Sequence, residues 1–182
     1  MARVNFDAAG KKINACGKYN NLDALWSSPS NGASIFVGNQ TAARSLDILD
    51  KNHITCVVNC TDCMPNYHQD NSRISYYRFD ISAFVHSPKS GDYMDKEIKT
   101  FISPMLAFVM DAISSGKSVL VHCLAGAHRA GTTGIALLMV FGEMNQNVAT
   151  ATAKRLRDVI NPIGNLPNFL SALERSCIKL KK

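Results

Sequence analysis

Hydrophobic and polar positions follow two different periods along the chain. Short apolar or β-branched runs, typical of strands, occupy residues 34–38, 54–61, 73–82 and 118–123. Longer stretches, in which apolar residues recur every three or four positions, predict helices over about 41–52, 95–114, 130–143, 147–160 and 167–178. Asn145 is expected to cap the fourth of these helices, and Pro167 suits the first turn of the fifth.

The alternation of strands with helices predicts the fold class. We expect an α/β sandwich with a mainly parallel central sheet of about five strands and helices on both faces. The run 118–123 is expected to be a buried central strand, because most of its residues are apolar. Ligands of such sheets bind beyond the carboxyl ends of the strands, so the residues that follow this run are the first candidates for a site.

The N-terminal part of the chain lacks both periods. Residues 1–30 are polar and rich in turn-forming residues, and they predict an N-terminal extension with one short helix. The remainder, 31–182, is expected to form a single domain, because 182 residues is an ordinary length for one domain.

Composition and charge exclude several classes of protein. The chain has 20 Lys and Arg against 14 Asp and Glu, and the net charge of +6 mildly favours an anionic substrate. Basic residues are not interleaved with aromatic ones in a stripe, so no nucleic-acid partner is expected. The longest apolar run, GIALLMVFG at 134–142, is too short to span a membrane, and neither end resembles a secretion or prenylation signal. We therefore expect a cytoplasmic protein, with the nucleus as a second location, and no membrane partner.

The six cysteines are interpreted as reduced thiols, since an intracellular location does not favour disulfides. Cys60 and Cys63 form a C-x-x-C pair, with Cys56 and His68 nearby. A structural zinc site needs a second ligand pair at a defined spacing, which the sequence does not provide. We therefore expect neither a metal nor another cofactor.

The stretch VLVHCLAGAHRAGTTG, residues 119–134, places a thiol and a guanidinium six positions apart between a strand and a helix. Gly126 and its small neighbours let the backbone curl, so that several N–H groups can point inward. The helix that begins near Arg129 directs its positive end at the same point, and the Arg129 fork suits two phosphate oxygens. The same dipoles stabilise a thiolate at Cys123. The stretch thus predicts a cradle for a tetrahedral dianion with a nucleophile at its base.

HCLAGAHR resembles the His-Cys-x5-Arg signature of cysteine-based protein phosphatases. SIFVGNQTAARSLDILDKNHITCVVNCT is similar to the strand, helix and strand of the dual-specificity branch, and LRDVINPIGNLPNFLSALE resembles its C-terminal helix pair. The likeness covers roughly residues 34–175. It implies the cysteine-based phosphatase fold, in which Cys123 attacks phosphorus to form a phosphocysteine that water then hydrolyses. It also implies that Arg129 holds the equatorial oxygens in the ground and transition states.

The resemblance assigns supporting roles to the neighbours of Cys123. His122 would orient the loop and tune the thiol by hydrogen bonding. The backbone amides would complete the phosphate cradle, and they belong to Leu124, Ala125, Gly126, Ala127 and His128.

Two aspartates are candidates for the general acid that the family places on a loop ahead of the helix preceding the cysteine strand. Asp92 lies 31 residues before Cys123, at the position that an alignment without gaps assigns to the acid. Asp80 lies 43 residues before it, in a strand that resembles the one leading to the acid. The two alignments differ by an insertion of about ten residues, ISAFVHSPKS. Asp92 is favoured because a mobile loop can bring its carboxylate over the cradle, and Asp80 remains open.

The chain departs from the family pattern at Ala130, where relatives usually carry a serine or threonine that assists hydrolysis of the phosphocysteine. That step is expected to be impaired, unless Thr132 or Thr133 supplies the hydroxyl. Slow relatives, the phosphatases of regenerating liver, also have alanine there, and they hold a second cysteine where this chain has Cys60. The resemblance implies a reversible Cys60–Cys123 disulfide, with Cys63 as a second choice of partner; the alternative is that Cys60 is simply a buried apolar residue.

The sequence therefore predicts a monomeric hydrolase that removes phosphate from phosphotyrosine, and also from phosphoserine or phosphothreonine, of phosphoprotein substrates. A phosphate or other oxyanion would occupy the active site. One alternative is a weakly active or inactive module that binds phosphoproteins, which Ala130 favours. Another is a phosphatase for a non-protein phosphate monoester, such as a phosphoinositide or an RNA 5′-phosphate, which the absence of lysine from the loop disfavours.

Overall fold

The computed structural model describes residues 20–85 and 91–176, and for residues 91–96 it describes the backbone alone. Five strands form one sheet in the order β1-β2-β5-β3-β4. They are β1 (Leu22–Ser27), β2 (Ser34–Gly38), β3 (Ile54–Asn59), β4 (Ser75–Arg78) and β5 (Ser118–His122). The pairs β2–β5, β5–β3 and β3–β4 are parallel, and β1 is antiparallel to β2. The predicted fold class is confirmed.

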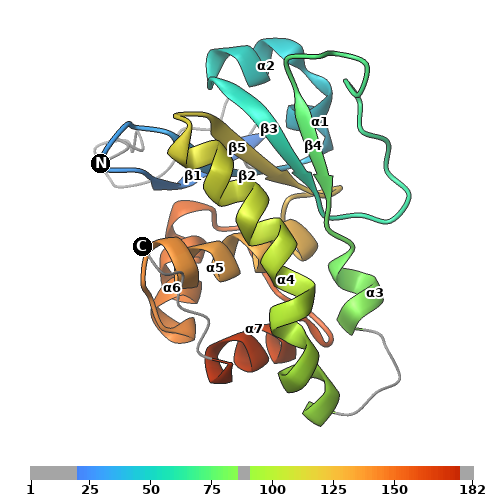
Figure 1. Cartoon of the computed structure of the whole chain (residues 1–182), viewed down its shortest axis with the longest axis vertical. Coiled ribbons are helices and arrows are strands. Elements are labelled where there is room, and N and C mark those ends of the chain that lie inside the picture. The colour runs from blue at the N-terminus through green and yellow to red at the C-terminus, as the bar shows by residue number, and fades with distance from the viewer. Residues whose placement is uncertain (1–19, 86–90, 177–182) are drawn as a thin grey trace.

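Seven helices cover the sheet in the described part of the chain, and Figure 1 shows them on both of its faces. The helices α1 (Gln40–Arg44) and α2 (Leu46–Lys51) pack on one face, where Ala42, Ala43 and Leu49 contact strand residues such as Val57 and Leu120. The other helices lie on the opposite face (Figure 1). They are α3 (Ile81–Val85), α4 (Gly91–Ser114), α5 (Arg129–Phe141), α6 (Gln146–Leu156) and α7 (Leu166–Arg175).

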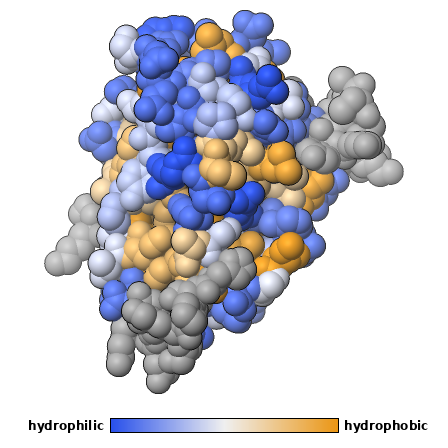
Figure 2. All heavy atoms as spheres, turned by 90° about the vertical axis from the view of Figure 1, so that its right-hand side faces the viewer, coloured by the Kyte–Doolittle hydropathy of each residue, from blue (hydrophilic) through white to orange (hydrophobic). Residues whose placement is uncertain are grey.

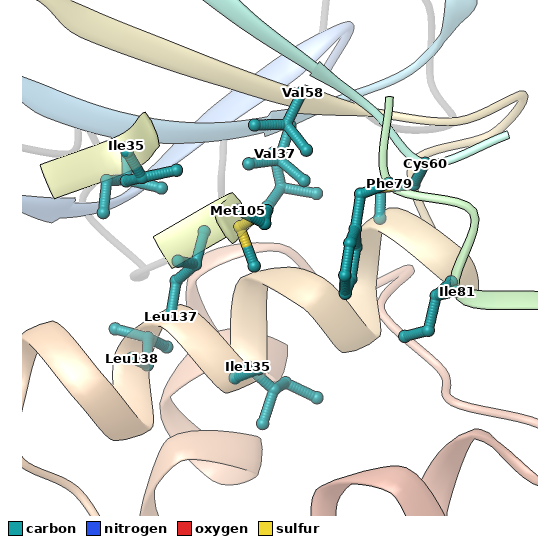
Figure 3. Packing of buried hydrophobic residues seen from close by; sticks show 14 of the residues in the cluster. Ile35, Val37, Val58, Cys60, Phe79, Ile81, Met105, Ile135, Leu137 and Leu138 are labelled. Carbon is teal, nitrogen blue, oxygen red and sulfur yellow. The ribbon is translucent and has the colours of Figure 1, made fainter. Parts of the chain in front are cut away.

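The main core lies between the sheet and this second group of helices. Figure 3 shows Ile35, Val37 and Val58 of the strands pointing toward the helices, with Leu137 of α5 and Met105 of α4 facing them. Strand β5 is buried at every position, as its apolar sequence predicted. The central strand therefore presents its carboxyl end, and the loop that follows it, from a rigid base.

One helix differs from the sequence prediction in its boundaries. The expected helix over 41–52 is two short helices, because the side chain of Ser45 accepts a hydrogen bond from the N–H of Ile48 and starts α2 afresh. The expected caps at the other end of the chain are confirmed. Asn145 caps α6 by accepting from the N–H of Val148 at 2.9 Å, and Pro167 lies in the first turn of α7.

The N-terminal prediction was wrong for residues 22–27. They form the edge strand β1 rather than a turn-rich segment with a helix, because Leu25 fills a core position and Trp26 packs on Phe141 with ring centroids 5.5 Å apart. The prediction rested on the polar residues around them, among which Asp23 and Ser28 are in fact buried. The sheet thus extends into the first 30 residues.

The segment predicted to be an insertion forms structure of its own. Residues 81–85 fold as α3, which the sequence did not predict. Phe84 stacks on Phe101 of α4, with ring centroids 4.2 Å apart, and both rings meet Phe169 of α7 edge-on. Helix α4 also begins earlier than expected, at Gly91 rather than near Asp95.

Figure 2 shows the side of the molecule that lies to the right in Figure 1. Hydrophilic residues cover its upper part, and apolar residues gather in its lower half. Within 20–85 and 91–176, no helix is both long and apolar enough to cross a membrane.

Candidate active site

The loop between β5 and α5 is held from outside through its carbonyl oxygens. Each of the five carbonyls of residues 124–128 accepts a hydrogen bond of 2.8–3.2 Å from the surrounding protein. The donors are the N–H of Gln40 to Leu124, the guanidinium of Arg157 to Ala125 and Gly126, and the N–H groups of Asn161 to Ala127 and of Thr132 to His128. The loop is therefore fixed on its outer side.

The amide N–H groups of the same loop are arranged differently. Across the described residues, none of the five N–H groups of 124–128 donates to a protein acceptor. Successive backbone N–H groups without protein acceptors are the donors that an anion-binding loop uses. The first turn of α5 adds the positive end of a thirteen-residue helix. The loop therefore has the free donors that binding of an oxyanion would need, and the predicted phosphate cradle stays a prediction.

Gly126 makes this curl possible. Its φ of +68° lies in the left-handed region, which strains any residue with a side chain. A Cβ at this position would also meet the carbonyl oxygen of Gly38 at 2.5 Å and the Arg157 guanidinium at 2.8 Å. Both the conformation and the space require glycine, as the sequence indicated.

The sequence analysis missed Arg157, which supports the loop from below. Its side chain is fully buried, forms an ion pair with Asp23 at 2.8 Å, and donates to the carbonyls of Asn20, Ala125 and Gly126. A buried guanidinium with carboxylate and carbonyl partners satisfies the charge that burial exposes. Arg157 therefore links β1 to the catalytic loop.

Cys123 is the first residue after β5, and it is only 4% exposed. It lies between β5 and the loop that leads into α5. Leu124, the next residue, is 61% exposed and marks the surface side of the loop. The thiol is therefore buried beside the loop, and its place at the base of a phosphate cradle stays a prediction.

Cys60 lies beside Cys123 across the sheet. Asn59 of β3 pairs with His122 of β5, so the next residue of each strand is a cysteine, and the N–H of Cys60 donates to the carbonyl of His122 at 2.8 Å. Its sulfur contacts the hydroxyl of Thr133 at 3.4 Å. Burial raises the pKa of the Cys60 thiol far above its usual value, so this cysteine stays protonated. The described cysteines, at 56, 60, 63 and 123, are all free thiols.

His122 is the last residue of β5, and its expected role in orienting the loop and tuning the thiol stays a prediction. Its side chain is fully buried, and the backbone of Cys123 acts on the pKa of its ring in the direction opposite to the larger effect of burial. Burial lowers the pKa of the ring to about 4, so the imidazole is neutral at physiological pH. The other loop histidine, His128, turns away: its Nδ1 lies 2.5 Å from the carbonyl oxygen of Asn161 and must carry the proton there.

Arg129 begins α5, and its guanidinium is partly exposed. Its Nη1 lies 3.7 Å from a carboxylate oxygen of Asp62, on the loop after β3. The sequence analysis did not single out Asp62, because nothing in its spacing ties it to the motif. The contact could be predicted only from the parallel pairing of β3 with β5, because that pairing brings the loops after the two strands to the same edge of the sheet.

The two acid candidates occupy different places. Asp80 follows β4 at the sheet edge that carries Cys123, and its carboxylate accepts from the N–H of Ala83 at 3.2 Å. Asp92 lies in the first turn of α4, and its side chain is outside the described residues. Figure 1 places the start of α4 at the end of the molecule remote from the sheet. A helix of 24 residues is about 36 Å long, which accounts for that separation.

Thr132 and Thr133 were the candidates to supply the hydroxyl that Ala130 lacks, but both hydroxyls already donate hydrogen bonds to backbone carbonyls. Ala130 is completely buried. Thr132 donates to the carbonyl of His128 at 2.7 Å, and Thr133 donates to that of Arg129 at 3.0 Å. Threonine hydroxyls inside helices commonly make this bond to the preceding turn. Neither threonine directs its proton at Cys123.

Metal-binding side chains do not gather in the part of the chain that the structure covers. Within it, no three His, Cys, Asp or Glu side chains are placed so that they could hold a metal ion. The C-x-x-C pair does not change this, since Cys60 is buried and Cys63 is exposed.

Comparisons with known proteins agree with this geometry. Human dual specificity protein phosphatase 9 is 29% identical over 143 residues, which cover 79% of this chain and 35% of the relative. The chain thus spans about a third of the length of the curated relatives that it matches first.

Solved structures share the fold. A mouse dual specificity phosphatase complexed with zinc tungstate superimposes with a TM-score of 0.69 at 21% identity, covering 90% of this chain and 92% of that one. The human tyrosine phosphatase-like serine/threonine/tyrosine-interacting protein superimposes with a TM-score of 0.60 at 23% identity, covering 85% and 93%.

The family model described as the dual specificity phosphatase catalytic domain matches residues 35–176, from the start of β2 to the end of α7. That range contains Cys123, the loop 124–128 and Arg129. This chain therefore belongs to the dual specificity phosphatase family.

Proposed function

We propose that the protein hydrolyses phosphotyrosine, together with phosphoserine or phosphothreonine, in phosphoprotein substrates. The observation that supports the proposal is the loop of residues 124–128, which follows the buried Cys123: its five carbonyls accept hydrogen bonds from the protein, while its amides have no protein acceptor among the described residues. Family membership supports the same chemistry. Hydrolysis of p-nitrophenyl phosphate and of a panel of phosphopeptides tests it, and phosphopeptides that release no phosphate would contradict it.

The reaction follows from the positions of these groups. The Cys123 thiolate attacks phosphorus, an S–P bond forms, and the P–O bond to the leaving group breaks while that oxygen takes up a proton. The loop amides and the Arg129 guanidinium hold the phosphoryl oxygens through the transition state. Water then attacks the phosphocysteine, releasing phosphate and the thiolate.

We propose Asp80, rather than the initially favoured Asp92, as the general acid. The parallel register β4–β3–β5 supports this choice, because it puts the carboxyl ends of β4 and β5 at one edge, roughly 10 Å apart. The start of α4 lies far from that edge (Figure 1). Part of the segment between the two aspartates folds as α3, and Asp92 follows it in the first turn of α4.

The variant Asp80→Asn is expected to lower kcat on a phosphotyrosine peptide about 100-fold, since a positioned acid typically contributes 10²–10⁴-fold. The loss should be smaller on an aryl phosphate with a good leaving group, which needs less protonation. Steady-state kinetics on both substrates measure it. A loss of this size in Asp92→Asn, with Asp80→Asn near wild type, would reverse the assignment.

We also propose that hydrolysis of the phosphocysteine limits turnover. The support is Ala130 together with the occupied hydroxyls of Thr132 and Thr133. A hydrogen bond to a charged group contributes about 1.5–3 kcal/mol, so Ala130→Ser is expected to raise the steady-state rate about tenfold. Rapid-mixing kinetics should show a burst of released phenol in the wild type and a smaller burst in the variant. A wild type without a burst would contradict the proposal.

The phosphoprotein-binding module is the second candidate. It is favoured by Ala130, and a solved relative with this fold is itself named an interacting protein. The two candidates differ in turnover: a binding module would retain a phosphopeptide without releasing phosphate. We place the enzyme first, because both Cys123 and Arg129 are present in the cradle.

We propose that Cys60 protects Cys123 against oxidation. A peroxide would convert the Cys123 thiolate to a sulfenic acid, and the Cys60 thiol would displace water to form the disulfide. Neighbouring parallel strands place the two Cα atoms roughly 5 Å apart, within the usual disulfide range. Peptide mapping after mild peroxide should recover the 60–123 linkage and no Cys63–Cys123 linkage. Over-oxidised Cys123 with no cross-linked peptide would contradict it.

The remaining proposals concern domain organisation and setting. We propose one catalytic domain that includes β1 and continues through α7, acting as a monomer in the cytoplasm or the nucleus without a membrane partner. The free thiols at 56, 60, 63 and 123 suit a reducing compartment. Cell fractionation and size-exclusion chromatography test these points.

A further inference from the structure

We infer that Asp62 is a positioning residue of the active site, which holds Nη1 of Arg129 so that the Nε–Nη2 edge of the guanidinium faces the phosphate cradle. The inference rests on the proposed function, because the oriented group matters only if the loop binds a phosphoryl oxyanion. It adds a residue from the β3–β4 connection to a site otherwise built on the β5–α5 loop.

The contact is specific to one end of the guanidinium. Nη1 of Arg129 lies 3.7 Å from Oδ1 of Asp62, and in the described part of the chain the side chain of Arg129 makes no other ion pair or hydrogen bond. Arginine offers five N–H donors in a planar fork. A carboxylate that engages Nη1 leaves the other edge available for two oxygens of a tetrahedral anion.

The loop that carries Asp62 is pinned in place by Arg78 of β4. The Arg78 guanidinium donates to the carbonyls of Thr61, Asp62 and Met64 at 2.7, 3.1 and 3.0 Å. Three consecutive contacts from one rigid side chain fix the path of the loop.

Asn59, at the end of β3, secures the same loop from its inner side. Its amide donates to the carbonyl of Met64 at 2.9 Å, and its oxygen accepts from the N–H and the hydroxyl of Thr61 at 3.2 and 2.7 Å. Asn59 and Thr61 are both buried. The backbone of Asp62 therefore stands on a fixed loop, although its side chain is exposed.

The carboxylate itself is also held. Its own backbone N–H, then the thiol and the backbone N–H of Cys63, keep the pKa of Asp62 below its usual range, with Arg129 contributing in the same direction. Asp62 therefore stays ionised at the pH at which a phosphatase works. Exposed ion pairs contribute little to folding stability, so the consequence of this contact is the orientation of Arg129.

An oriented Arg129 would bind an oxyanion more tightly than a mobile one, because the side chain loses less freedom on binding. Isothermal titration calorimetry with sodium tungstate measures this directly, with kcat/KM for p-nitrophenyl phosphate as a second readout. In Asp62→Ala we expect the dissociation constant of tungstate to rise about fivefold and kcat/KM to fall by about the same factor. Asp62→Glu, which keeps the carboxylate, should return both values to within about twofold of wild type.

Asp70 provides a matched control, because it is an exposed aspartate of the same connection that forms no ion pair among the described residues. Asp70→Ala removes the same charge and should leave both values unchanged. The urea midpoint of Asp62→Ala should equal that of the wild type, which separates positioning from a structural role.

Two results would overturn the inference. Unchanged tungstate binding in Asp62→Ala would show that Arg129 does not depend on Asp62, and tighter binding would show that Asp62 competes with the anion. Failure of the proposed function looks different: the wild type would then neither bind tungstate nor hydrolyse the aryl phosphate, and the inference would fall with it.

Discussion

Replacing Cys123 by serine is expected to lower the hydrolysis of p-nitrophenyl phosphate by about 10⁴-fold or more, because loss of a covalent nucleophile removes most of the rate enhancement. The hydroxyl occupies nearly the same volume, and the loop is held through its carbonyls rather than through the thiol. Oxyanion binding should therefore survive in the variant. Steady-state kinetics and calorimetry with tungstate measure the two properties separately.

Cys56→Ala is the matched control for this change. Cys56 is a buried thiol of β3, and burial raises its pKa, so it is protonated and unreactive. Its replacement should leave kcat near wild type. Residual activity of Cys123→Ser within tenfold of wild type would exclude the covalent mechanism.

Replacing Arg157 by methionine is expected to lower the free energy of unfolding by about 3–5 kcal/mol, as breaking a buried ion pair typically does. The change removes the cationic partner of the buried Asp23 carboxylate and the side-chain donor to the carbonyls of Ala125 and Gly126. The value of kcat should fall as well, because the carbonyls of Ala125 and Gly126 lose their hydrogen bonds from Arg157. Urea denaturation followed by circular dichroism measures the stability.

Two further variants test the physical cause. The double variant Arg157→Met with Asp23→Leu should recover part of the loss, because it removes the buried carboxylate together with its cationic partner. Arg155→Met, an exposed position in the last turn of α6, should stay within about 0.5 kcal/mol of wild type. An Arg157→Met protein as stable as the control would contradict the role assigned to this ion pair.

The parts that could be predicted from the sequence are those encoded by local pattern. The β-branched run of β3 and the apolar run of β5 each identified a strand, and Asn145 and Pro167 marked helix starts. The loop could be located because Gly126, the adjacent strand and the following helix are neighbours in the chain.

The parts that could not be predicted depend on contacts between distant segments. Arg157 is 31 residues from Gly126, and a lone arginine near the end of a helical pattern usually lies in solvent. Asp62 meets Arg129 only because β3 and β5 are adjacent and parallel. The edge strand β1 was missed because its apolar residues stand among polar ones, and only the sheet shows which side they face.

The central claim is that the loop amides and Arg129 hold an oxyanion against the sulfur of Cys123. Alkylation by iodoacetamide at neutral pH, with and without tungstate and followed residue by residue by mass spectrometry, tests this most directly, with the exposed Cys63 as an internal reference. We predict that tungstate protects Cys123 from alkylation and leaves the reaction of Cys63 unchanged. Alkylation of Cys123 at the same rate with and without the anion would contradict the account.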